Sequence, residues 1–113
     1  MRLMIIHIQK EDDLAVIASL LFELGLFNAA VIDGESIENI GVNQEALFSS
    51  FQNLFGKGSA YNRTLFVPVP DMEVVKNFMS LCGHEGIDFN SPDVGWVLSF
   101  PCDFFWGPEE LAV

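Results

Sequence analysis

The sequence predicts an α+β domain made of two strand-helix-strand halves. Two kinds of segment alternate along the 113 residues: short runs of β-branched and large apolar residues, and longer stretches with apolar residues at helical spacing. The first kind is typical of buried strands, and the second of helices that bury one face. Right-handed crossovers place both helices on one face of a four-stranded antiparallel sheet. We therefore predict a ferredoxin-like βαββαβ domain over residues 1–113, with a long helical insertion between strands 2 and 3.

The first half begins with an expected strand over residues 2–9. Its apolar side chains run almost without interruption, which is typical of a strand buried on both faces or lying in an interface. Asp12 or Asp13 is expected to cap the helix that follows. A second strand over residues 29–33 ends at an Asp-Gly turn signal. The expected buried stripe of the first helix is Leu14, Ile17, Leu20, Leu21 and Leu24.

The second half repeats this order. Residues 63–69 form an expected strand, in which Pro68 favours an edge or terminal position because proline has no N–H to donate. Asp71 is the expected cap of the second helix. Residues 95–100 supply the last strand. The expected buried stripe of the second helix is Val75, Phe78, Met79 and Cys82.

Between the halves lies an insertion over residues 35–62, which is too long for an ordinary connection. Residues 43–56 have a helical pattern with a phenylalanine-rich face that includes Phe48, Phe51 and Phe55. Two interpretations are open. The face can pack on its own domain or a neighbouring subunit, or it can bind a partner protein. We predict that these three phenylalanines are partner-binding residues, because binding usually resides in loops on a rigid scaffold.

Composition excludes some classes of function. Five Lys and Arg against sixteen Asp and Glu give a formal net charge of −11, so the chain cannot build the basic face that nucleic acid requires. No apolar run approaches the roughly 20 residues of a membrane span, and no signal peptide is visible, so we expect no membrane insertion. Two cysteines are too few for a disulfide framework, which favours reduced thiols and a cytoplasmic location.

The residues that could carry chemistry are few. His7 lies mid-strand, where a hydrogen-bonded core or interface histidine is the expected role. Cys82 and His84 form the one cluster with soft metal-ligand chemistry, and the alternative is a buried free cysteine beside an exposed histidine. Neither a phosphate-binding glycine loop nor a nucleophile or acid–base constellation is visible. We therefore expect a binding protein rather than an enzyme.

The order of these segments resembles the PII signalling superfamily of small βαββαβ trimers. The resemblance is carried by residues 14–34, by the segment Phe66-Val67-Pro68-Val69-Pro70-Asp71, and by Pro92-Asp93-Val94-Gly95-Trp96-Val97. It implies a cytoplasmic homotrimer that binds a small ligand at subunit junctions. It also implies that the 35–62 insertion corresponds to the mobile loop through which PII proteins contact a partner protein.

The chain departs from the PII pattern where PII proteins bind nucleotide. The turn over residues 92–95 has no lysine, and residues 102–106 contain no arginine. A phosphate chain there would face Asp93 and Asp103 without compensating cations. We therefore expect no ATP binding of the usual PII kind, and the sequence names no cofactor. The candidate ligand-binding residues are Asp33, Gly34, Lys57, Arg63, Cys82, His84, Asp93 and Gly95.

A second class of function stays open beside this one. Copper-tolerance-like trimers have a related fold, and in that interpretation Cys82 and His84 would bind a metal ion with help from carboxylates. Both classes predict an oligomer. The apolar first strand and the aromatic segment over residues 101–108 exceed what one sheet with two helices can bury, which favours subunit association.

Overall fold

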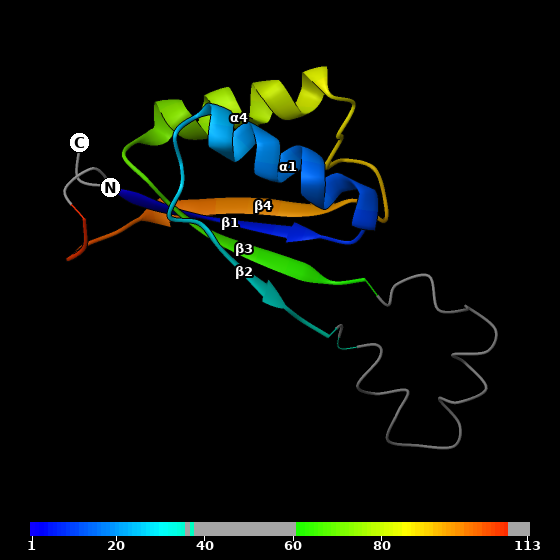
Figure 1. The fold of residues 1–113 in the computed structure, drawn as a ribbon, viewed down its shortest axis with the longest axis horizontal. Coiled ribbons are helices and arrows are strands. Elements are labelled where there is room, and N and C mark those ends of the chain that lie inside the picture. The colour runs from blue at the N-terminus through cyan, green and yellow to red at the C-terminus, as the bar shows by residue number, and fades with distance from the viewer. Residues whose placement is uncertain (36, 38–60, 109–113) are drawn as a thin grey trace.

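The computed structural model describes residues 1–35, 37 and 61–108. Its four strands form one sheet in the order β2-β3-β1-β4, and each neighbouring pair is antiparallel. Both helices lie on the same face of this sheet (Figure 1). The predicted α+β class is confirmed, and the arrangement is compatible with a ferredoxin-like fold. The elements are β1 (Arg2–Ile8), α1 (Glu11–Glu23), β2 (Ala30–Asp33), β3 (Arg63–Val69), α4 (Met72–His84) and β4 (Gly95–Pro101).

The core lies between the sheet and the two helices. Alternate residues of β1 and β3 point into it, because successive side chains of a strand point to opposite faces. Fully burying one such aliphatic side chain stabilises the fold by roughly 1.5–3 kcal/mol. Within the described residues, neither helix is long and apolar enough to cross a membrane. The core side chains with almost no exposure are Met4, Ile6, Ile8, Ile17, Leu65, Val67, Val69, Phe78 and Cys82.

Helix α1 begins earlier than the sequence pattern predicts. Its N-cap is Lys10, whose side chain makes no capping hydrogen bond, so the expectation of a cap at Asp12 or Asp13 is wrong. Glu11, Asp12 and Asp13 instead occupy the first turn, where their negative charge is favourable at the positive end of the helix dipole. The predicted stripe is confirmed, because Ile17, Leu20 and Leu21 are buried and Leu14 and Leu24 pack against the core.

Helix α4 begins where the sequence predicts. The side chain of Asp71 accepts a hydrogen bond from the backbone N–H of Val74 at 3.1 Å, which confirms it as the N-cap. Val75, Phe78 and Cys82 are buried as expected. Met79 is 36% exposed, so its assignment to the buried stripe is wrong. It lines a small cavity at the β4 edge of the sheet instead, at the margin of the core.

The position of β3 decides between the two expectations drawn from its proline, because Pro68 is the last residue but one of β3 and so lies at a terminal position. β3 is an inner strand between β2 and β1, so Pro68 does not lie on an edge strand. However, β2 pairs only with the segment of β3 from Arg63 to Phe66. At Pro68 the side of β3 that faces β2 therefore has no paired strand among the described residues, and a missing N–H is tolerated there.

Candidate functional site

Several candidate residues lie at one end of the sheet. In the strand register Asp33 is opposite Arg63, Arg63 is opposite Ile8, and Ile8 is opposite Gly95. A single row of paired residues therefore joins the end of β2 to the start of β4. Asp93 lies two residues before Gly95 in the chain. Five of the candidate ligand-binding residues therefore lie at the same end of the sheet: Asp33, Gly34, Arg63, Asp93 and Gly95.

The β2–β3 side of this sheet end is held together by its own groups. The Arg63 guanidinium forms an ion pair with the Asp33 carboxylate and lies over the Tyr61 ring, 4.8 Å from its centroid. The backbone N–H of Gly34 donates to the carbonyl oxygen of Asn62 at 2.9 Å. Because Arg63 already has a carboxylate partner, an anionic ligand would have to compete with Asp33 for it.

The β4 side is a backbone turn with special geometry. Asp93 has a φ of 70° and Gly95 a φ of 133°, both in the left-handed half of conformational space. The backbone N–H of Gln9 donates to the carbonyl oxygen of Val94 at 3.0 Å, which ties the turn to the end of β1. A Cβ atom at position 95 would lie 1.8 Å from the carbonyl oxygen of His7. Only glycine fits this crossing.

The structure separates Cys82 from His84. Cys82 is fully buried in the core, whereas His84 is exposed in the last turn of α4. Burial, with a smaller contribution from the Asp13 carboxylate, raises the pKa of the Cys82 thiol to about 11. Metal ions bind the thiolate rather than the thiol, so this environment disfavours metal binding. In the described part of the chain, no three His, Cys, Asp or Glu side chains gather at a possible metal site.

The remaining sequence candidates belong to the 35–62 insertion. Lys57 and the three phenylalanines Phe48, Phe51 and Phe55 lie outside the described residues, as does the predicted helix over residues 43–56. Their ligand-binding and partner-binding roles stay predictions.

The face of the sheet opposite the helices exposes several large apolar side chains. No described helix covers it (Figure 1). Trp96, Leu98 and Phe100 are 46%, 43% and 44% exposed, and on β2 Ile32 is 50% exposed. We call this surface the open face. By strand register its members are Ala30 and Ile32 on β2, Thr64, Phe66 and Pro68 on β3, Leu3, Ile5 and His7 on β1, and Trp96, Leu98 and Phe100 on β4.

The open face includes the first strand, as the sequence indicated, and other strands as well. That strand was expected to be buried on both faces or to lie in an interface, and the structure buries one of its faces beneath the helices. The contribution of β4 was not identified from the sequence. Its signal was the alternation of Trp96, Leu98 and Phe100 with smaller residues. The aromatic segment after β4 is also exposed, with Phe104 at 77% and Trp106 at 90%.

His7 is the titratable residue on the open face. Its Nδ1 lies 3.2 Å from the Thr64 hydroxyl oxygen on β3, and its ring stacks on Trp96 of β4 with centroids 5.1 Å apart. Burial lowers the pKa of its imidazole from the usual value near 6.5. The hydrogen bond expected of His7 is present, His7 is not a core residue, and its expected place in an interface stays a prediction.

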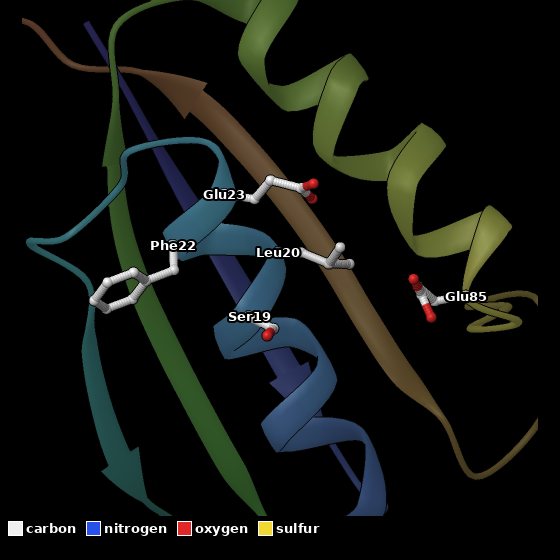
Figure 2. A pocket seen from close by; sticks show the side chains of 5 residues that line it. All are labelled: Ser19, Leu20, Phe22, Glu23 and Glu85. Carbon is white, nitrogen blue, oxygen red and sulfur yellow. The ribbon is translucent and has the colours of Figure 1, made fainter.

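A separate groove lies on the outer side of the helices. It has a volume of about 460 Å³ and is lined by residues of α1 and by Glu85, which follows α4. Figure 2 shows the carboxylates of Glu23 and Glu85 with the Leu20 side chain between them. Ser19 and Phe22 complete the lining. The two exposed carboxylates disfavour an anionic ligand in this groove.

Comparison with known proteins adds no relative. No protein-family model matches the chain, and a search of curated proteins finds none that matches it. The fold, the sheet end and the open face are therefore the features that indicate a function.

Proposed function

We propose that the chain is a non-enzymatic regulatory protein of the PII type. It assembles into a homotrimer through the open face, binds a small ligand at the subunit junctions, and contacts a partner protein through residues 35–62. The observation that carries this proposal is the open face, which offers apolar side chains from all four strands on one side of the sheet.

The composition of the open face indicates that another protein chain covers it. Antiparallel sheets with one solvated face usually alternate apolar and polar residues, so that polar side chains face water. Here Thr64 and His7 are the polar members among eleven, and the other nine are apolar. Apolar surfaces of this kind mark sites of protein association. A second copy of the chain has the same apolar face. Copies related by a rotation axis can therefore bury these faces against one another in a closed oligomer.

The sheet end supports a ligand at the edge of this interface. Asp33 and Arg63 lie one row beyond Ile32 and Thr64, which belong to the open face. A subunit packed on the open face therefore comes close to the backbone at this end of the sheet, while the Asp33 and Arg63 side chains belong by register to the face that carries the helices. The polar groups of the sheet end suit a small polar ligand better than a polyphosphate, because the Arg63 charge is already balanced by Asp33.

ATP is accordingly expected not to bind in the usual PII manner. Its phosphates would meet the carboxylates of Asp33 and Asp93, and the Arg63 guanidinium is already paired with Asp33. Calorimetry with magnesium-ATP is expected to show no binding at micromolar concentrations. Micromolar affinity would contradict this expectation. The Asp93→Asn variant, which suits the left-handed backbone there, would then show whether the nucleotide contacts the turn.

Trp96 reports directly on whether the open face is covered. The chain has two tryptophans, so Trp106→Phe leaves Trp96 as the single indole emitter. At about pH 8, where His7 is neutral, we expect blue-shifted emission from concentrated protein and a red shift on dilution as the subunits separate. The matched control is Trp96→Phe, whose remaining Trp106 is 90% exposed in the isolated chain. Emission from Trp96 typical of a half-exposed indole at every concentration would contradict the proposal.

The metal-binding alternative has no comparable support. It depends on Cys82 and His84. Cys82 is buried in the core, whereas His84 is exposed to solvent. No observation on the described residues favours it over the regulatory function.

A further inference from the structure

His7 lies on the inner strand β1, in the row of the open face that is nearest the sheet end, and its neighbours on this face are uncharged. On one side is Thr64 of β3 and on the other is Trp96 of β4. The adjoining row on these strands consists of Phe66, Ile5 and Leu98. Both helices lie on the opposite face of the sheet (Figure 1). None of the described residues that share the open face with His7 carries a titratable or charged side chain.

The charged residues of the strands, Arg2, Asp33 and Arg63, belong by register to the opposite face. Asp33 and Arg63 share their row with Ile8, which is fully buried beneath the helices, so by register they alternate away from His7. The Thr64 hydroxyl can donate to or accept from the neutral imidazole, whichever tautomer is present. It cannot supply the negative charge that a buried imidazolium needs.

We propose that protonation of His7 dissociates the assembly, so that the open face is a pH-sensitive interface between copies of this chain. The inference rests on the proposed assembly, because it requires a second copy to cover the face. In the assembled state the neutral ring is stacked and hydrogen-bonded in an apolar interface. An imidazolium in the same place is desolvated without a counter-ion, which favours the separated chains.

The sign of the effect follows from linkage. Burial in the isolated chain already lowers the pKa of His7 from 6.5, and covering the face lowers this pKa further. Assembly is therefore strongest above about pH 6.5 and weakens as the pH falls below the pKa of the isolated chain. Between the two pKa values the association constant falls by about tenfold per pH unit for each His7 that is buried.

The overall charge of the protein acts in the opposite direction. The formal net charge is −11 with neutral histidines, so acidification reduces the repulsion between subunits and favours association. Dissociation at lower pH therefore cannot arise from this general charge effect. It requires a specific group whose protonation opposes burial.

The experiment is light scattering of the full chain at one micromolar concentration, at about pH 8 and about pH 5.5, where ordinary carboxylates stay ionised. The chain has two histidines, which makes the assignment direct. The wild type is expected to have a multiple of the chain mass at the higher pH and to dissociate at the lower one. His7→Phe, which keeps an aromatic ring beside Trp96, is expected to stay assembled at both. His84→Gln is expected to behave like the wild type.

The outcomes separate the two proposals. A wild type that is assembled to the same extent at both pH values overturns the switch and leaves the assembly standing. A single-chain mass at both pH values overturns the proposed assembly and the switch together. Loss of the pH dependence in His84→Gln, with its retention in His7→Phe, assigns the effect to His84 and overturns the role of His7. Far-ultraviolet circular dichroism at the lower pH checks that dissociation is not unfolding.

Discussion

Replacing Gly95 by alanine is expected to lower the melting temperature by roughly 15 °C or more, or to prevent folding altogether. The added Cβ would lie 1.8 Å from the backbone carbonyl oxygen of His7, and no side-chain rotation relieves a contact between main-chain-anchored atoms. The φ of 133° adds strain for any residue with a Cβ. Strands β1 and β4 must separate at this point. A cost of about 4 kcal/mol is comparable with the whole stability of a small domain.

The matched control is Gly83→Ala. Gly83 lies in α4, and an added Cβ there has nothing within 4 Å. Alanine favours a helix over glycine by about 1 kcal/mol, so this variant is expected to melt at or above the wild-type temperature. Thermal unfolding followed by circular dichroism compares the two. A Gly95→Ala protein that melts within a few degrees of the wild type would show that the β1–β4 crossing is not as close as described.

Leu98→Glu is expected to convert the assembly into single folded chains. Leu98 is 43% exposed on the open face, opposite Ile5 of β1, so the isolated chain can keep a carboxylate there in water. In the assembly each copy would bury an unpaired charge, at a cost of several kcal/mol per copy. A cost of about 4 kcal/mol per copy weakens association by roughly 1,000-fold. Light scattering at micromolar concentration measures the loss.

Ala15→Glu controls for the added charge. Ala15 is exposed on α1, on the helical side of the sheet, so the variant gains the same negative charge away from the open face. It is expected to keep the wild-type mass. Equal dissociation of both variants would mean that general repulsion, rather than burial at the open face, governs assembly. A Leu98→Glu protein that retains the wild-type mass would place the interface elsewhere.

Most of the fold was predictable because its signals are local. Residues 63–69 were predicted as a strand from their apolar run and have those bounds in the structure. Asp71 was predicted as a cap from its place before a helical pattern, and its carboxylate accepts the expected hydrogen bond. Each of these signals depends on residues within a few positions of one another, which is the range over which sequence patterns are informative.

The predictions that failed or left alternatives open concern features that depend on packing between segments far apart in the sequence. The helix pattern placed Met79 in the buried stripe, but the edge of the sheet ends nearby and leaves it partly exposed. Pro68 favoured an edge or terminal position, and only the packed sheet decides between them: Pro68 lies near the end of an inner strand, beyond the part of β3 that pairs with β2.

The candidate site was predictable only in part. Asp33, Arg63 and Gly95 were identified singly, but their common row depends on the register of four strands. The stacking of His7 on Trp96 joins residues from opposite ends of the chain, so no local pattern could indicate it. Cys82 and His84 are close in sequence, yet the helix turns one into the core and the other into solvent.

If copies of this chain assemble through the open face, the wild-type protein in solution has the mass of an oligomer and not that of one chain. Light scattering at micromolar concentration and about pH 8, where His7 is neutral, is expected to give about three times the chain mass of 12.6 kDa. A mass of one chain at every concentration up to the limit of solubility would contradict the account.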